Sequence, residues 1–201
     1  MHLDLQNQIM ERLERIGARG PARELLELHE RYLSLLSKWN RTINLTSLPL
    51  DPPTGEAIDR LLVEPISASA LADAPGHIID MGTGGGSPAI PFWIQLPGSR
   101  LTMVESRSRK CAFLREVVRQ IRPGQGDAFE NRFEEVLEKH PELAGSADIV
   151  TVRAVRLDDP TSALIGALLK PTGRVFHFSA KLEIVECSTW NKLGHKGRGS
   201  S

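Results

Sequence analysis

A single stretch, residues 77–88, limits the possible folds of this chain more than any other. It reads His-Ile-Ile-Asp-Met-Gly-Thr-Gly-Gly-Gly-Ser-Pro, and the residues that follow, up to 96, are largely apolar. Residues 77–81 predict a short buried strand, and residues 88–96 predict a helix with proline in its first turn. The glycines between them let the backbone turn tightly and place bare peptide N–H groups against a ligand. Strand, glycine turn and helix indicate the nucleotide-binding half of a doubly wound α/β fold, although a turn that only connects two elements has the same pattern.

The residues around the glycine loop narrow the class of cofactor. Residues 100–105 predict a second strand ending in Glu105, a position from which a carboxylate accepts both ribose hydroxyls of NAD, FAD or S-adenosylmethionine. Dinucleotide sites require the spacing G-x-G-x-x-G, whereas Gly82 and Gly84 begin a different glycine run that closely follows Asp80. A negative charge there repels a pyrophosphate but attracts the sulfonium and ammonium groups of S-adenosylmethionine. The pattern therefore favours S-adenosylmethionine, with Asp80, Gly82, Gly84 and Glu105 as cofactor-binding residues.

Length and composition bound the architecture. With 201 residues, 40% of them hydrophobic and 25% charged, the chain is typical of a soluble protein with one well-filled domain. We expect a helical part over residues 1–76, a Rossmann-like core over 77–187 and a flexible tail over 188–201, of which residues 194–201 are basic. No apolar run approaches the roughly 20 residues that span a bilayer, and the first residues lack the features of a signal peptide.

The cysteines and the charge indicate the surroundings of the protein. Cys111 and Cys187 lie far apart with no metal-ligand spacing, which is typical of reduced cytosolic thiols, and the six histidines form no metal motif. We therefore expect a cytoplasmic monomer that does not bind a metal ion. The formal net charge is zero, so any contact with RNA must come from local basic patches rather than from the whole surface.

Apolar periodicity predicts the other elements. Before the glycine loop we expect a short helix within residues 1–20, a longer helix over 22–39, and a helix over 58–71 that Pro65 must kink or restart. The apolar face of the second helix comprises Leu25, Leu28, Tyr32, Leu35 and Trp39. Further along we expect strands over 127–130, 147–152, 174–178 and 182–187, and helices over 106–122, from residue 131 and near 160–170. This alternation gives a right-handed, mostly parallel sheet.

The most basic stretch lies in the helix expected over residues 106–122. Six of its residues are basic and one, Glu116, is acidic; the basic residues are Arg107, Arg109, Lys110, Arg115, Arg119 and Arg122. Charge runs of this kind are usually solvated faces, and contact with phosphate groups is the other interpretation.

Several short motifs are similar to those of a known family. They read Trp-Asn-Arg-Thr-Ile-Asn-Leu-Thr at 39–46, Ile-Asp-Met-Gly-Thr-Gly-Gly-Gly at 79–86, Val-Glu-Ser at 104–106, Lys-Cys-Ala-Phe-Leu-Arg at 110–115, Asn-Arg-Phe-Glu-Glu at 131–135 and Val-Arg-Ala at 152–154. With them the chain resembles the glucose-inhibited division protein B family, bacterial enzymes that methylate a guanine at N7 in small-subunit (16S) ribosomal RNA, over about residues 22–181. The resemblance implies the Rossmann-like fold of class I S-adenosylmethionine-dependent methyltransferases, with N-terminal helices, and ribosomal RNA or a ribosomal particle as the partner.

The resemblance also implies a set of site residues. Positions at which the family contacts S-adenosylmethionine match Gly82, Ser87, Phe133, Glu134 and Arg153. Positions expected to shape the methyl-transfer site or to hold RNA match Arg132, Arg153 and Lys181. Arg153 is also a candidate from its place alone, because an arginine directly after a buried strand points into the ligand crevice.

The chain departs from the family in several segments. Residues 60–65 replace a His-x-x-Asp-Ser segment, and Ser87-Pro88-Ala89 replaces the usual Gly-x-Pro-Gly. Leu182 stands where the family has glycine, and about twenty residues follow where the family has a long helix and a closing antiparallel pair. Two alternatives therefore stay open: a methyltransferase for a small molecule or a protein, and a binding protein that has lost turnover.

The expected chemistry needs few catalytic groups. Guanine N7 carries an in-plane lone pair and no proton, so its attack on a sulfonium methyl needs no general base, and we expect no catalytic histidine or aspartate. The rate would come from aligning N7 with the methyl group, with Arg153 or Arg132 stabilising the charge that moves onto the guanine. Since side chains cannot enter the deep groove of A-form RNA where N7 lies, the target must be an unpaired or extruded base.

Overall fold

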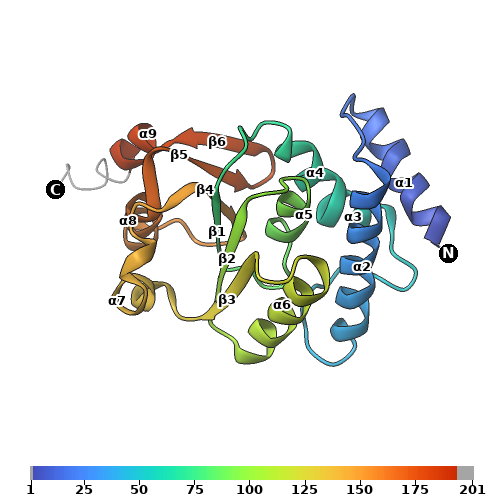
Figure 1. Ribbon diagram of the computed structural model, residues 1–201, viewed down its shortest axis with the longest axis horizontal. Coiled ribbons are helices and arrows are strands. Elements are labelled where there is room, and N and C mark those ends of the chain that lie inside the picture. The colour runs from blue at the N-terminus through green and yellow to red at the C-terminus, as the bar shows by residue number, and fades with distance from the viewer. Residues whose placement is uncertain (1, 194–201) are drawn as a thin grey trace.

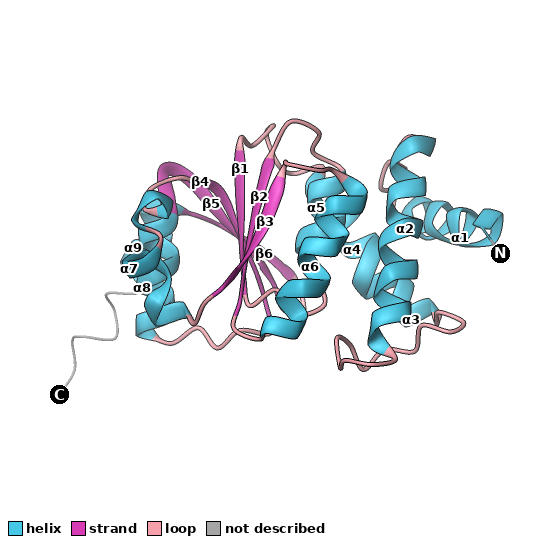
Figure 2. Cartoon of the chain, turned by 60° about the horizontal axis from the view of Figure 1, so that its bottom comes forward, coloured by secondary structure: helices cyan, strands magenta, loops and turns pink. Residues whose placement is uncertain are grey.

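The computed structural model describes residues 2–193, which form a central sheet with helices on both faces (Figures 1 and 2). One face carries α5, Ala89–Ile94, and α6, Ser108–Ile121. The other face carries α7, Val136–Lys139, α8, Asp159–Leu168, and α9, Cys187–Leu193. The doubly wound α/β arrangement expected from the sequence is confirmed.

Within the described residues, six strands form one sheet in the order β3-β2-β1-β4-β5-β6. Their bounds are β1 His77–Met81, β2 Arg100–Glu105, β3 Gly126–Glu130, β4 Ala147–Arg153, β5 Leu169–Phe178 and β6 Leu182–Glu186. The first five pair in parallel, and β6 runs antiparallel to β5. Because the chain returns from β3 to the far side of β1, the strand order reverses between β1 and β4. Ligands of open α/β sheets bind at the carboxyl ends of the strands beside such a reversal.

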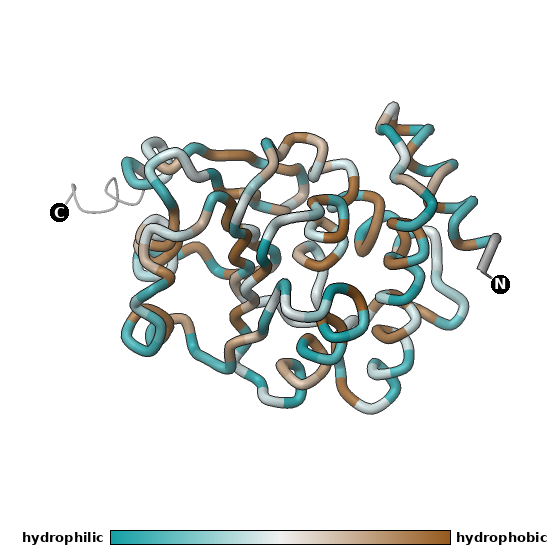
Figure 3. Tube along the Cα trace, viewed as in Figure 1, coloured by the Kyte–Doolittle hydropathy of each residue, from teal (hydrophilic) through white to brown (hydrophobic). Residues whose placement is uncertain are grey.

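The central strand is buried on both faces, which is why its sequence is a short apolar run. Ile78 packs into the core on the side of α5 and α6, whereas Ile79 and Met81 pack into the core on the side of α8 and α9. Strands covered on both faces are expected to be hydrophobic throughout rather than alternating. Figure 3 shows the same distribution, with hydrophobic colour along the central strands and hydrophilic colour on outward turns of the helices.

The helices before the sheet form a further layer outside α5 and α6 (Figure 2). They include α1, His2–Arg15, and α2, Arg23–Asn40, as the periodicity predicts. The apolar face of α2 is wider than expected, because α1 packs on it as well as α5 and α6. Of the five residues expected inside, Tyr32 is buried and the others are half-buried, while the remaining buried apolar positions are Leu26, Leu33 and Leu36. None of the helices described within residues 2–193 combines the length and apolar character needed to cross a bilayer.

Pro65 interrupts the helix expected over 58–71, as the sequence predicts. The segment consists of α3, Gly55–Ile58, a π-helical turn η1, Asp59–Val63, and α4, Glu64–Ser69. Proline lacks a backbone N–H and its ring clashes with the carbonyl group four residues earlier. The wider π turn accommodates it, because the N–H of Glu64 donates to the carbonyl oxygen of Asp59. Such turns are frequent at functional sites.

The structure corrects the expected end of the chain. A flexible tail was expected over 188–201, but residues 187–193 form α9, and residues 194–201 lie outside the described part. Trp190 explains the helix: its side chain is buried and its Nε1 donates to the carbonyl oxygen of Ser162 at 2.9 Å. Cys187, one turn earlier, packs into the same core.

Two other elements differ from the expectation. Strand β5 begins at Leu169 rather than at 174. Residues 169–173 were expected to connect β5 to the preceding helix, but they belong to the strand, and a register shift in the pairing with β4 accommodates them. The helix expected from residue 131 is only a 3-10 turn η2, Phe133–Glu135, followed by the short α7 and a second 3-10 turn η3, Pro141–Leu143. The proline at the start of η3 prevents α7 from continuing as a longer helix.

Three of the six basic residues in and beside α6 have partners within the protein. Arg115 donates to the carbonyl oxygen of Ala128, and Arg119 pairs with Glu116. Arg122 donates to the carbonyl oxygens of Trp93 (2.9 Å) and Ile94 (2.7 Å) at the end of α5, and its guanidinium lies 5.1 Å from the centre of the Trp93 ring. These contacts favour a structural role for Arg122 over contact with phosphate.

We expect Arg122→Ala to lower the free energy of unfolding by about 1–3 kcal/mol, because it removes the side-chain donor to the carbonyl oxygen of Ile94 and the contact with the Trp93 ring, whereas the carbonyl oxygen of Trp93 keeps the N–H of Leu96. The matched substitution Arg119→Ala removes only an exposed pair and should change stability little. Urea unfolding of both variants measures the difference. Equal stabilities would contradict the role assigned to Arg122.

Candidate active site

The glycine loop leaves β1 at the carboxyl edge of the sheet. Gly82, Gly84 and Gly86 have φ values of +75°, +56° and +93°, a region that other residues rarely adopt. The N–H groups of Gly82 and Thr83 donate to the carbonyl oxygen of Val104, at 2.9 and 3.2 Å, and thereby tie the loop to β2. The strand, turn and helix predicted from residues 77–96 are confirmed, with the helix confined to α5.

Glu105, the last residue of β2, is held beside this loop. Its Oε2 accepts from the N–H of Gly84 and its Oε1 from the N–H of Arg107, both at 2.9 Å, and the residue is only 7% exposed. Each carboxylate oxygen can accept a further hydrogen bond. The group is thus oriented by backbone donors and keeps the acceptor capacity that a pair of ribose hydroxyls requires.

Phe133 and Val155 lie over the first glycine. A Cβ built on Gly82 would be 2.8 Å from Val155 Cγ2 and 3.3 Å from Phe133 Cζ, so only glycine fits there. The segment that carries Phe133 is anchored next to Glu105, because the N–H of Asn131 donates to the carbonyl oxygen of Glu105 at 3.2 Å. Asn131 Oδ1 is 3.0 Å from His140 Nε2, and the His140 ring stacks on Phe129. The glycine loop, the end of β2 and the segment of Phe133 thus lie close together, and we refer to these three segments as the cradle.

Asp80 lies beneath the loop rather than at its mouth, which differs from the placement expected from the sequence. The residue is 1% exposed, and Thr151 Oγ1 donates to its carboxylate. Burial raises the pKa of Asp80 from its ordinary value of 3.8 to about 6, although hydrogen bonds from Thr151 and Thr83 lower it. Its charge can therefore act on a cofactor only through the loop above it.

Tyr32 ties α2 to the same loop. Its hydroxyl group donates to the carbonyl oxygen of Gly85 at 2.8 Å, and the side chain is fully buried. Burial raises the pKa of Tyr32, so that the hydroxyl stays a donor. Ala89, which replaces a family glycine, is also fully buried, and its methyl group is accommodated at the start of α5.

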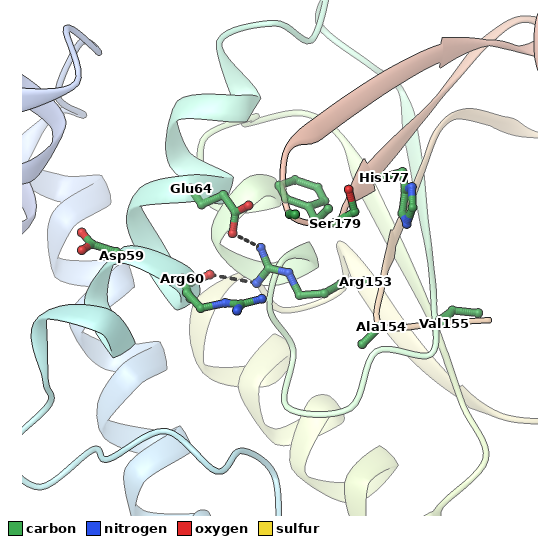
Figure 4. Close-up of a pocket in the computed structure, with 10 residues that line it drawn as sticks. Asp59, Arg60, Glu64, Arg153, Ala154, Val155, His177 and Ser179 are labelled. Atoms are coloured by element: carbon green, nitrogen blue, oxygen red, sulfur yellow. Dashed lines mark hydrogen bonds and ion pairs between the residues drawn. The ribbon is translucent and has the colours of Figure 1, made fainter. Parts of the chain in front are cut away.

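Arg153, the last residue of β4, reaches across the carboxyl edge of the sheet (Figure 4). Its Nη1 donates to the carbonyl oxygen of Arg60 at 2.8 Å and to Ser87 Oγ at 3.0 Å. Its Nη2 pairs with Glu64 Oε2 at 2.5 Å, and the guanidinium lies 5.0 Å from the centre of the Phe178 ring. These contacts fix the arginine between the glycine loop and the π turn.

A pocket of about 620 Å³ opens beside Arg153. Its walls come from η1, from the carboxyl ends of β4 and β5, and from the residues that follow them. The lining residues are Asp59, Arg60, Glu64, Arg153, Ala154, Val155, His177, Phe178, Ser179 and Ala180. Val155 lines this pocket and also contacts Gly82, so the pocket adjoins the cradle.

The structure gathers most of the residues proposed from the sequence. Gly82, Gly84, Ser87, Glu105, Phe133 and Arg153 surround the loop, with Glu134 exposed on η2. Arg132 and Lys181 are exposed and do not line the pocket. Glu64 does line it and was missed, although a carboxylate at the place of the family's aspartate was a usable signal. No group of three or more metal-ligating side chains occurs in the part of the chain that the structure describes.

The fold, the glycine loop and the acid at the end of β2 define a class I methyltransferase fold. A Plasmodium falciparum structure assigned to the protein-L-isoaspartate O-methyltransferases, in complex with S-adenosyl-L-homocysteine, has a TM-score of 0.55 at 15% identity and covers 90% of this chain and 88% of that one. A Methanococcus maripaludis structure assigned to the S-adenosyl-L-methionine-dependent methyltransferases has a TM-score of 0.50 at 13% identity, covering 80% and 66%. At these identities the likeness concerns the fold.

The family follows from sequence comparison. The sequence model of GidB, described as rRNA small subunit methyltransferase G, matches residues 25–194, and the chain belongs to this family. Relatives named ribosomal RNA small subunit methyltransferase G are 38% identical over 148 residues in Stenotrophomonas maltophilia and 37% identical over 145 residues in Xanthomonas axonopodis. The match covers 71% of this chain and 63% of each relative, so the chain spans less than two thirds of their length.

We expect Gly82→Ala to destabilise the protein more than Gly124→Ala. The two glycines have φ values of +75° and +79°, so alanine costs roughly 1–2 kcal/mol of backbone strain at either. Only at Gly82 must Phe133 and Val155 also move, which adds about 1–3 kcal/mol. Urea unfolding measures both, and equal losses would show that the cradle is not tightly packed.

Asp80→Asn should change the pH dependence of stability. A carboxyl pKa raised from 3.8 to about 6 means that the folded state binds the proton more tightly. Its contribution is fully present below pH 3.8 and is lost as the pH rises through about 6, a change on the order of 3 kcal/mol. The stability of the variant relative to the wild type should therefore increase between pH 4 and pH 7. Thermal unfolding at several pH values measures this, and a difference that is independent of pH would contradict it.

Proposed function

We propose that this protein transfers a methyl group from S-adenosylmethionine to N7 of a guanine in small-subunit ribosomal RNA. The single observation that carries the proposal is the oriented Glu105 carboxylate at the glycine loop, in a chain of the rRNA small subunit methyltransferase G family. The relatives that it matches are named as methyltransferases of small-subunit ribosomal RNA, which supports the proposed reaction class and acceptor. We further propose that the protein acts in the cytoplasm, where ribosomal RNA would be its substrate, and that it acts as a monomer.

The residues of the cradle fit the proposed cofactor. Glu105 would accept the ribose hydroxyls, and the half-buried ring of Phe133 would lie against the adenine at the edge of the sheet, with Glu134 beside it. Gly82 and Gly84 would let the cofactor approach the backbone, and Ser87 with Arg153 would close the end of the site nearer the pocket. S-adenosylmethionine, when bound, supplies an electrophilic methyl group on a positively charged sulfur.

The pocket next to the cradle would hold the acceptor base. Because guanine N7 carries a lone pair and no proton, the protein needs no general base, and its task is to hold the base in line with the methyl group. A base inside an A-form helix cannot present N7 to side chains, so the pocket would receive an unpaired or extruded guanine. Arg132 and Lys181 are exposed outside the pocket, and we propose that they contact the RNA backbone.

Labelled S-adenosylmethionine tests this function. The protein is incubated with unmodified small-subunit RNA, both naked and as ribosomal particles, and the label is mapped by chemical cleavage at N7-methylguanine. We expect label at a single guanine. Cofactor binding without label on either RNA would contradict the proposed acceptor.

Glu105→Gln should weaken cofactor binding by about tenfold or more. The amide nitrogen that replaces one carboxylate oxygen is a donor, so it can accept neither from the backbone N–H group nor from a ribose hydroxyl. Glu116→Gln on the exposed face of α6 is the matched control and should bind the cofactor like the wild type. Calorimetric titration of both variants measures this. Unchanged affinity in Glu105→Gln would mean that the ribose lies elsewhere.

A further inference from the structure

The carboxylate of Glu64 lies in the pocket with no role in the cradle. Figure 4 shows Glu64 extending from the helical side and Arg153 from the sheet side, so that their charged groups meet within the pocket. The Glu64 side chain is 31% exposed and that of Arg153 is 13% exposed. The π turn η1, which ends directly before Glu64, brings this carboxylate to the carboxyl edge of the sheet.

The two side chains together present a donor next to an acceptor. A guanidinium has five N–H groups, and Arg153 uses three of them, toward Arg60, Ser87 and Glu64. Nη1 uses both of its hydrogens and Nε is buried without a partner among the described residues, so one N–H group of Nη2 is left for a ligand. Only Oε2 of Glu64 contacts Arg153, so the carboxylate keeps lone pairs on both oxygens.

This pair matches one edge of guanine. The Watson–Crick edge of guanine carries the O6 acceptor beside two donors, N1–H and the 2-amino group. N7, the atom to be methylated, lies on the other side of O6 and stays free. We propose that Glu64 accepts hydrogen bonds from N1–H and the 2-amino group of the target guanine while Arg153 donates to O6. This proposal rests on the proposed function and identifies the residue that selects guanine.

The same geometry rejects adenine. Adenine has an amino group in place of O6 and a lone pair at N1, so its donor would face Arg153 and its lone pair would face the carboxylate. Both contacts would be repulsive, and repulsive contacts discriminate against the wrong base more strongly than the absence of a hydrogen bond does. The pocket is thus selective by its charges rather than by its size.

The charge of Glu64 also has the sign that the reaction needs. The lone pair of N7 forms a bond to the methyl carbon while the carbon–sulfur bond breaks, and its electron pair stays on sulfur. The sulfur becomes neutral and the guanine acquires the positive charge, with no proton transferred. A carboxylate on the base stabilises this developing charge, whereas an arginine does not. The expectation that Arg153 or Arg132 stabilises the charge is therefore replaced: Glu64 does so, and Arg153 positions Glu64 and the base.

The test compares guanosine with inosine at the target position of the RNA. Inosine keeps N7, O6 and N1–H and lacks only the 2-amino group. We expect the wild type to prefer guanosine by about tenfold in kcat/KM, because inosine leaves one hydrogen bond to a carboxylate unmade. Glu64→Ala should lower kcat on guanosine by about 100-fold and abolish the preference, so that both RNAs react at the same low rate.

Controls separate recognition from structure. Glu64→Asp keeps a carboxylate and should recover part of the preference, and Glu56→Gln, on the exposed start of α3, should leave it unchanged. If Glu64 only held Arg153, its loss would slow both RNAs equally, and an unchanged guanosine-to-inosine ratio in Glu64→Ala would overturn the proposal. A wild type that methylates neither RNA would instead contradict the proposed function itself. Cofactor affinity measured by calorimetry verifies that each variant is folded.

Discussion

The parallel pairing of β1 with both β2 and β4 is the constraint on which the site depends. A strand hydrogen-bonded on both sides and covered on both faces must end at a point where the backbone suddenly lacks partners. Here the N–H groups of Gly82 and Thr83 donate to the carbonyl oxygen of Val104, that of Gly84 donates to Glu105 and that of Gly86 to the carbonyl oxygen of Thr83. Glu105 on one neighbour and Arg153 on the other are the terminal residues of their strands, so the sheet itself sets their separation.

The π turn connects two parts of the protein that the sequence presents as separate. It brings the helical layer to the carboxyl edge of the sheet, where the ion pair of Glu64 with Arg153 crosses between them. A partly buried ion pair adds little net stability, because desolvation offsets the attraction between the charges. Its value is geometric, since the pair fixes which side chains of the two layers face each other.

Much of the fold and part of the site could be predicted from the sequence. The strands and the glycine loop could be predicted, because short apolar runs and glycines determine local structure. Glu105 and Arg153 could be predicted from their places at the ends of strands. Asp80 could not be placed, since strand alternation alone does not say whether a carboxylate near the end of a strand meets solvent or the core. Glu64 and α9 depend on contacts with Arg153 and with Ser162, which are distant in sequence.

The hydroxyl group of Tyr32 has a consequence for how the helical layer behaves. It joins the middle of α2 to the carbonyl oxygen of Gly85, within the loop that would receive the cofactor. A ligand that favours the loop geometry in which this hydrogen bond forms would also favour the packing of α2, and the packing of α2 would favour ligand binding by the same coupling free energy, because linkage is reciprocal. The outer helices would therefore be coupled to cofactor binding through the loop. In hydrogen exchange, the amides of α2 would report whether the loop is filled.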